Sequence, residues 1–238
     1  MKRLSAFCGK VFLVLALSAV FLLACRSDEA PDALDNETSY AFGMLMANML
    51  RGEMGIEGLI FDYDAFRDGF RDFNEGRETR ISQDMAIDRI NAALIMLQAR
   101  MDEERWLEGE RNHAEGEAFL AENRLRSGVR TTASGLQYEV IVQGSGARPG
   151  PNDVVRVHYE GTFIDGTVFD SSFARGFPVE FPLGGVIPGW TEGLQLMSEG
   201  GTYMLFVPPE LAYGVGGAGI IPPNSTLIFR VELLSVIH

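Results

Sequence analysis

The residues that usually carry metal or nucleophilic chemistry are sparse in this chain. Its two cysteines, Cys8 and Cys25, lie near the N-terminus, and its three histidines, His113, His158 and His238, are far apart in the sequence. A zinc site needs three or four such ligands at short spacings, and a disulfide framework needs several cysteine pairs. The spacing therefore predicts no metal site, and no cofactor is expected.

Two glycine-rich motifs also fail to indicate known chemistry. Ser145 lies in Gly-Ser-Gly, which is not a nucleophile elbow, and no histidine is placed to act as its base. Residues 214–219 match the dinucleotide-binding pattern G-x-G-x-x-G. The next residues are Ile-Ile-Pro-Pro, which cannot begin a helix, so no helix N-terminus is available for a pyrophosphate. We interpret residues 214–219 as a flexible loop.

Aromatic side chains are instead spread over the C-terminal third. They are Tyr159, Phe169, Phe181, Trp190, Tyr213 and Phe229. Aromatic residues usually fill a core, and composition alone favours that role. Only the order of the motifs around them can distinguish a core from an apolar binding pocket.

The charge balance excludes one broad class of function. The 238 residues include 20 Lys and Arg against 33 Asp and Glu, a formal charge of −13. Such a chain is repelled by nucleic acids and by anionic lipid surfaces. Hydrophobic residues make up 46% of the sequence, enough for a real core. We expect one or two folded domains and no nucleic-acid partner.

The N-terminus has the pattern of an export signal. Three basic residues lie within the first ten positions, and residues 11–23 form an apolar run of 13 residues. This length suits a signal peptide and is short of the ~20 residues that a bilayer-spanning helix needs. The run ends in Leu-Leu-Ala before Cys25. That ending resembles a bacterial lipobox, in which cleavage precedes a cysteine that carries lipid on its sulfur.

The lipobox resemblance predicts a lipoprotein signal peptide over residues 1–24, a lipidated Cys25 and a polar tether over residues 25–36. Two or more acyl chains give lasting attachment to a membrane. The protein is therefore expected in the bacterial cell envelope, facing the periplasm or the cell surface. The alternative is an ordinary signal peptide followed by an incidental cysteine.

The centre of the chain is predicted to be helical. Apolar residues recur at helical spacing over residues 40–50, Asp62 can cap a second short helix, and Ser82 can cap a longer one that continues toward Arg126. The long segment contains an apolar seam with spacings of 3, 4, 3 and 4 residues: Ile87, Ile90, Leu94, Leu97 and Met101. Beyond this seam charged residues dominate, which predicts a solvated spacer. We assign residues 37–80 to a helical module and residues 81–127 to a linker helix.

The two short helices have methionine and aromatic faces that bury little area alone. The periodicity leaves two alternatives open. The helices fold back on the long helix within one chain, or two chains interlock and bury Phe42, Met46, Phe66 and Phe70 together.

The pattern changes to that of β-strands from Gly135 onward. Residues 136–142, 154–159 and 226–234 alternate or run apolar, as half-buried strands do, and residues 190–197 form the one good helical stretch. About five strands and one short helix predict an α+β domain over residues 128–238, with an antiparallel sheet folded against the helix.

Five sequence blocks of this domain closely resemble the FKBP-type peptidyl-prolyl isomerases. They read Val-Arg-Val-His-Tyr-Glu-Gly from Val155, Gly-Thr-Val-Phe-Asp-Ser-Ser from Gly166, Val-Ile-Pro-Gly-Trp from Val186, Leu-Ala-Tyr-Gly from Leu211, and Gly-Ile-Ile-Pro-Pro-Asn-Ser-Thr-Leu-Ile-Phe from Gly219. Residues 61–70 and 119–138 are similar to the dimerising module and linker of the macrophage-infectivity-potentiator (Mip) and periplasmic FkpA-like branch. This upstream resemblance favours a homodimer formed through residues 37–100.

The resemblance implies a set of site residues. Trp190 would form the floor of a proline pocket, and Tyr213 and the backbone N–H of Ile187 would each bind a substrate carbonyl. Asp170 would lie at the rim, held by Tyr159 and Arg175, as a structural ion-pair member or as a catalytic dipole. The remaining pocket and substrate-contacting residues would be Phe169, Phe229, Val179, Val186 and Ile221.

Such a pocket has a physical reason to work without acid, base or cofactor. An X–Pro bond isomerises slowly because amide resonance must be broken, at a barrier of ~18–20 kcal/mol. A dry site removes the hydrogen bonds that favour the planar, charge-separated imide.

Some positions depart from the commonest family pattern. Val179 stands where human members tend to carry Phe, and the loop 214–220 carries Ala218 where some members have a larger residue. These changes concern substrate preference and inhibitor affinity. Strand alternation places His158 away from the pocket face, so we expect no chemical role for it.

The leading prediction is an exported, lipid-anchored, dimeric peptidyl-prolyl isomerase. Its substrates would be proline-containing unfolded or nascent exported proteins, and its pocket would bind the macrolide inhibitors of FKBPs. The alternative is a dimeric chaperone (holdase) or a surface binding module in which isomerisation is incidental. The Met- and Phe-rich helices keep that alternative open.

Overall fold

The computed structural model describes residues 35–52 and 61–237. The predicted signal peptide, the tether up to residue 34 and Cys25 lie outside the described residues. The chain divides into two compact units, residues 1–94 and 95–238. No helix in the described ranges is long and apolar enough to cross a membrane.

The first unit contains the helices predicted from sequence, α2 (Asn36–Gly52), α3 (Tyr63–Asn74) and the start of α4 (Gln83–Asn123). The carboxylate of Asp62 caps α3 by accepting hydrogen bonds from the backbone N–H groups of Asp64 and Ala65, at 3.1 and 3.0 Å. The hydroxyl of Ser82 accepts one from the backbone N–H of Met85 at 3.2 Å. Both predicted caps are therefore confirmed.

After Met101 most of α4 is exposed, as the charged residues predicted, but one face of the helix packs on the C-terminal domain, and the helix ends at Asn123. The second half of α4 packs on the C-terminal sheet: the ring of Phe119 lies 6.1 Å from that of Phe206. The side-chain amide of Gln137 donates to the Leu120 carbonyl at 2.8 Å and accepts from that of Asn123 at 2.8 Å. Buried glycines and amides contribute to this contact beside the Phe119 ring, and no continuous apolar seam runs along this half of the helix.

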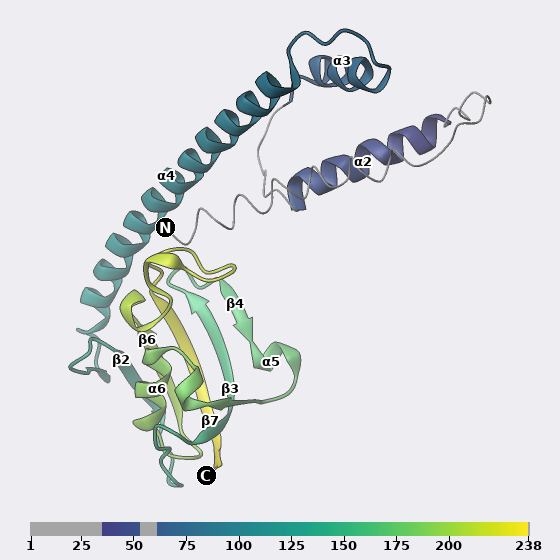
Figure 1. Cartoon of the computed structure of the whole chain (residues 1–238). Coiled ribbons are helices and arrows are strands. Elements are labelled where there is room, and N and C mark those ends of the chain that lie inside the picture. The colour runs from purple at the N-terminus through teal and green to yellow at the C-terminus, as the bar shows by residue number, and fades with distance from the viewer. Residues whose placement is uncertain (1–34, 53–60, 238) are drawn as a thin grey trace. The chain divides into compact units, whose positions relative to one another are not determined.

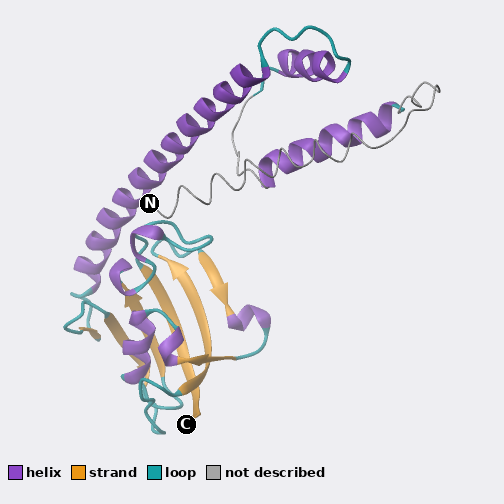
Figure 2. Ribbon diagram, in the orientation of Figure 1, coloured by secondary structure: helices purple, strands orange, loops and turns teal. Residues whose placement is uncertain are grey.

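The second unit is built on one antiparallel sheet of seven strands (Figures 1 and 2). The order is β1-β2-β6-β7-β3-β4, and β5 also pairs with β3. The strands are β1 (Val129–Thr131), β2 (Gln137–Val142), β3 (Val154–Phe163), β4 (Val168–Ser171), β5 (Val179–Pro182), β6 (Thr202–Val207) and β7 (Leu227–Ile237). The predicted α+β architecture is confirmed, with more strands than the five expected because three of them have only three or four residues.

Short helices and helical turns lie between the strands along the chain. The main one is α6 (Pro188–Gln195), the predicted helix, and it lies against the sheet (Figure 1). The others are α5 (Ser172–Arg175), η3 (Leu183–Gly185), η4 (Pro209–Leu211) and η5 (Gly214–Gly216). No helix follows residues 214–219 before β7 begins, in agreement with the rejection of a dinucleotide site.

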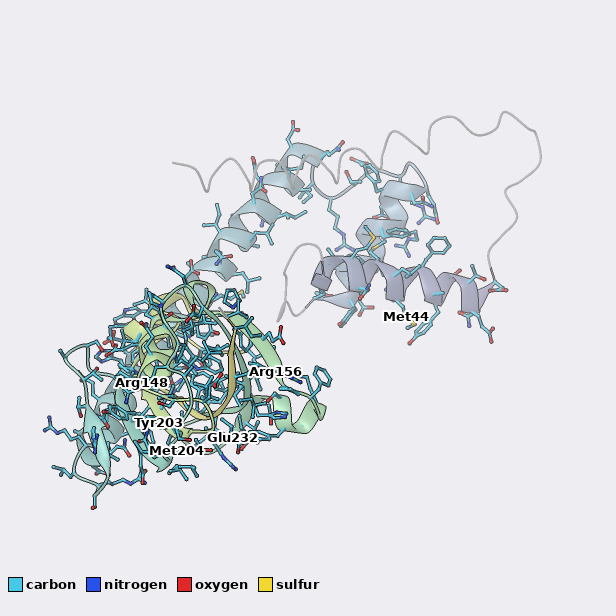
Figure 3. The ribbon with its side chains drawn as sticks, turned by 90° about the horizontal axis from the view of Figure 1, so that it is seen from below. Met44, Arg148, Arg156, Tyr203, Met204 and Glu232 are labelled. Atoms are coloured by element: carbon cyan, nitrogen blue, oxygen red, sulfur yellow. The ribbon has the colours of Figure 1, made fainter. Side chains whose placement is uncertain are left out.

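Strand alternation separates buried from more exposed side chains along β3, β6 and β7. Val155, Val157 and Tyr159 of β3 are buried, as are Leu227, Phe229, Val231 and Leu233 of β7. Arg156, Met204 and Glu232, labelled in Figure 3, each lie between two buried neighbours and are more exposed than these. One face of the sheet thus makes the core with α6, and it carries the aromatic residues of interest.

Candidate functional site

Trp190 lies at the centre of a cluster of aromatic rings. Its side chain is 4% exposed, and it is carried by the first turn of α6. Three rings approach it almost perpendicularly: Tyr159 at 5.1 Å and 86°, Phe181 at 5.5 Å and 87°, and Phe229 at 5.3 Å and 84°. Edge-to-face geometry at these centroid distances is attractive because the positive edge of one ring meets the negative face of another. The Trp190 indole N–H is buried without a hydrogen-bond partner among the described residues.

Phe169 of β4 extends the cluster toward solvent. Its ring lies 5.7 Å from Phe229 at 88° and 5.0 Å from Phe163. The rings of Phe169 and Phe229 pack over the bare backbone of Gly161, where a Cβ atom would lie 2.5 Å from Phe169 Cζ and 2.9 Å from Phe229 Cε1. A glycine at this position of β3 therefore leaves the space that the two rings occupy.

Sequence analysis left two rings of this cluster, Phe163 and Phe181, out of the site. Phe163 follows Tyr159 and Gly161 at every second position of β3, so strand alternation could have placed it on the same face. Phe181 belongs to β5, a strand of four residues whose existence the sequence did not indicate.

The predicted aliphatic residues pack against the hydrophobic core that includes these rings. Val179, Val186, Ile187 and Ile221 are partly buried and pack against the core cluster. Ile187 is the N-cap of α6, at the helix end where backbone N–H groups have no partner within the helix. Tyr213 lies between η4 and η5 and is 42% exposed.

A polar corner closes one side of the cluster. The Tyr159 hydroxyl donates to one carboxylate oxygen of Asp170, and the Arg175 guanidinium donates to the other. Arg175 also donates to the Tyr159 hydroxyl at 3.0 Å, and its guanidinium lies 5.6 Å from the centre of the Tyr159 ring. The structure thus contains the Tyr159–Asp170–Arg175 arrangement that the family resemblance implied.

This corner changes the pKa of both acids in opposite directions. Burial alone would raise the pKa of the Asp170 carboxyl, but hydrogen bonds from Tyr159 and Arg175 and the charge of Arg175 bring it below its usual range. Burial, and then the hydrogen bond to Asp170, raise the pKa of the Tyr159 hydroxyl. Asp170 is therefore charged and Tyr159 neutral over the whole physiological range.

We expect isomerisation to be independent of pH between about 5 and 9, because neither Asp170 nor Tyr159 titrates there.

A carboxyl with a lowered folded pKa stabilises the fold above its unfolded pKa of about 3.9 and loses this contribution as pH falls through the folded value. The Tm difference between wild type and Asp170→Asn should be constant near neutrality and vanish in acid. A bell-shaped pH profile of isomerase activity centred near neutrality would contradict the expected pH independence of isomerisation.

The structure places His158 outside the ring cluster, as the alternation predicted. Its Nδ1 lies 3.0 Å from the Ser172 hydroxyl, and its ring stacks on Phe173 at 4.8 Å. The described residues contain no group of three or more His, Cys, Asp or Glu that could hold a metal ion.

Comparison with known proteins shows the family to which this chain belongs. Residues 146–234 match the family model for the FKBP-type peptidyl-prolyl cis-trans isomerase, and residues 35–140 match the model for the domain amino terminal to it. A 22 kDa isomerase of this type from Escherichia coli is 46% identical over 207 residues, which cover 87% of this chain and 97% of that protein. The chain therefore belongs to the FKBP-type peptidyl-prolyl cis-trans isomerases, and it is an isomerase.

Other relatives match this chain over most of its length. A probable FkpA isomerase from Neisseria meningitidis is 44% identical over 84% of this chain and 74% of its own length. A protein of Legionella longbeachae named outer membrane protein MIP is 40% identical over 84% of this chain and 85% of its own length. The crystal structure of Escherichia coli FkpA aligns with 90% of this chain and 99% of its own, at 36% identity and a TM-score of 0.68.

Proposed function

We propose that the ring cluster around Trp190 is the place where the proline of a substrate binds and its X–Pro bond rotates. The observation that carries this proposal is the set of three perpendicular rings on Trp190, with Phe169 over Gly161 beside them. Phe169, Val179, Val186, Ile187 and Ile221 would form the walls around the proline. Water would be excluded from the imide, which would disfavour its planar, charge-separated form.

Two polar groups would fix the peptide while the bond rotates. The exposed Tyr213 hydroxyl would donate to one substrate carbonyl, and the Ile187 backbone N–H to another. Asp170 has two possible roles here, a structural anchor for Tyr159 and Arg175 or a fixed dipole beside the twisting carbonyl. Its contacts with both residues support the first, and its partial exposure leaves room for the second.

An FKBP-directed macrolide tests this location of the site. We expect it to inhibit cis–trans exchange of a Leu-Pro peptide by residues 26–238 and to change the fluorescence of Trp190. A Trp106→Phe background removes the signal of the other tryptophan, which is exposed on α4. Inhibition without any change at Trp190 would mean that the inhibitor, and with it the substrate, binds elsewhere.

We also propose that residues 37–100 form a homodimer. The helices of this segment leave large apolar side chains exposed in the single chain, among them Met44, which is labelled in Figure 3 and 58% exposed. On α3 the exposed rings are Tyr63, Phe66, Phe70 and Phe73. Isolated exposed side chains are ordinary, but a run of this size indicates a covered surface.

The dimer has a direct test in light scattering on residues 26–238. We expect twice the mass of one chain for wild type and for the control Arg67→Ala, whose side chain is exposed on the same helix. Phe70→Asp should give the single-chain mass, because a carboxylate cannot be buried unpaired at an apolar interface. A monomeric wild type would refute the dimer.

The proposed location is the bacterial cell envelope, with Cys25 carrying the lipid. The lipobox-like Leu-Leu-Ala before Cys25 supports this proposal, as does the relative named outer membrane protein. Residues 1–24 would be removed as a signal peptide, and residues 25–36 would form the tether. Cys25→Ser should yield a soluble or unprocessed form, and a variant that stays with membranes after a carbonate wash would argue against the anchor.

The proposed domain organisation of the chain is a helical module over residues 37–80, a linker helix over 81–127 and the isomerase domain over 128–238. Its substrates would be proline-containing proteins that fold after export. Apolar side chains of the helical module that the dimer leaves uncovered would support holdase activity as a second function. Phe169→Ala in the full chain separates holdase activity from isomerisation, because the variant should still suppress aggregation of a client protein after it has lost isomerase activity.

A further inference from the structure

The second half of α4 contacts the loop that carries two of the proposed substrate-binding residues. This loop, residues 208–226, connects β6 to β7 and contains Tyr213 and Ile221. Gly109, Asn112 and Gly116 lie at positions i, i+3 and i+7 of α4, and so on one face of the helix. All of these residues belong to the second unit of the chain.

The two glycines let the helix backbone come unusually close to the loop. A Cβ atom on Gly109 would lie 3.1 Å from Pro223 Cβ. A Cβ atom on Gly116 would overlap the hydroxyl oxygen of Thr226 and lie 3.1 Å from its Cβ. Gly109, Gly116, Pro223 and Thr226 are all buried, so this contact excludes water.

Three hydrogen bonds link the helix to the loop at points more than 100 residues apart in sequence. The Asn112 side chain donates to the Pro223 carbonyl at 2.8 Å, and the Asn224 side chain donates to the Gly109 carbonyl at 3.3 Å. The Arg105 guanidinium donates to the Gly216 carbonyl at 3.1 Å. The helix is thus bonded to both arms of the loop, on either side of Ile221.

Asn224 connects the helix to the arm that bears Tyr213. It is the one non-glycine residue with a positive φ in the described part of the chain, at 53°, a conformation that asparagine tolerates better than most residues. In this conformation its backbone N–H donates to the Gly214 carbonyl at 2.9 Å, next to Tyr213. A shift of the helix contact would therefore reach Tyr213 through Asn224.

We propose that α4 sets the position of the 208–226 loop over the substrate, and that Asn112 and Asn224 are positioning residues for the isomerase reaction. This inference rests on the proposed contacts of Tyr213 and Ile221 with substrate. The rings that meet at Trp190 come from β3, β5, β7 and α6, and none of these ring contacts involves α4. Loss of the helix contact should therefore weaken substrate binding and leave the rotation step largely intact.

The test compares Asn112→Ala with Glu115→Ala, which removes an exposed side chain from the same stretch of the helix. For Asn112→Ala we expect KM for a Leu-Pro peptide to rise about five-fold with kcat changed less than about two-fold, the pattern of lost binding rather than lost chemistry. Hydrogen exchange of the Ala218 and Asn224 backbone amides, which are bonded within the loop, should become faster while the amides of β3 and β7 are unchanged. Glu115→Ala should match wild type in every readout.

A second pair of variants tests the same contact through shape. Gly116→Ala should raise KM because its new methyl group overlaps Thr226, and Thr226→Ala in the same chain should restore KM by removing that hydroxyl. Faster loop exchange with an unchanged KM would overturn the inference, since α4 would then support the loop without affecting catalysis. Tyr213→Phe separates this result from failure of the proposed site. If Tyr213→Phe raises KM and Asn112→Ala does not, only the inference on α4 fails. If Tyr213→Phe has no effect, the proposed contact between Tyr213 and the substrate fails, and the inference on α4 fails with it.

Discussion

Phe169→Ala should lower kcat/KM for a Leu-Pro peptide by about tenfold or more, a loss of at least about 1.4 kcal/mol of transition-state stabilisation. Phe169 is the half-buried ring between Phe163 and Phe229, so its loss admits water to the side of the proposed proline site. The effect should appear in kcat as well as in KM, because exclusion of water acts on the twisted imide more than on the planar one. Rates of cis–trans exchange measured over a range of peptide concentrations give both constants.

Phe173→Ala is the matched control for this variant. Phe173 is also a phenylalanine of the β4–α5 segment, but it stacks on His158 and lies under the Arg230 guanidinium, away from Trp190. Both variants remove one partly exposed ring, so both should cost similar stability, less than the roughly 3–5 kcal/mol of a fully buried Phe→Ala change. Equal losses of activity in the two variants would show that Phe169 acts through stability alone.

Gly161→Ala should reduce activity by a similar factor, although it replaces no aromatic residue. The added methyl group would lie 2.5 Å from Phe169 Cζ and 2.9 Å from Phe229 Cε1, distances that the rings cannot keep. Both rings must move into the space proposed for the proline, and overpacking of this kind costs typically about 1–3 kcal/mol of stability. Measurements of kcat/KM and of the free energy of unfolding separate the two effects.

Gly150→Ala provides the control for the glycine substitution. A Cβ atom there would lie 3.5 Å from the Asp153 carboxylate, an ordinary contact, and the backbone does not have a positive φ. We expect wild-type activity from this variant. Gly161→Ala with full activity would mean that the space over Gly161 is not used by the substrate.

Much of the C-terminal domain could be predicted because its signals are local. Alternation in the long strands β3 and β7 gave their inner faces, and five motif blocks gave Trp190, Tyr159 and Phe229, whose rings the fold brings together. The family resemblance implied the link between Asp170 and Arg175, which are five residues apart, and the structure contains it. Phe181 was named among the aromatic residues but not assigned to the site, because β5 is only four residues long and carries little periodic signal.

The role of α4 could not be predicted for a different reason. Sequence patterns detect a buried helix face through its apolar residues, but this face consists of Gly109, Asn112 and Gly116. Its contacts are close backbone approach and amide hydrogen bonds to residues more than 100 positions away. The surrounding charged residues predicted a solvated spacer, because they occupy the other faces of the same helix.

The central claim is that the substrate proline lies against Trp190, and intermolecular nuclear Overhauser effects test it most directly. The protein, residues 26–238, would be labelled only at its two tryptophans and mixed with a Leu-Pro peptide under conditions of rapid exchange. We predict cross-peaks between the proline ring protons and the Trp190 indole, and none to Trp106, which is exposed on α4. Catalysed exchange with no contact between the proline and Trp190 would contradict the account.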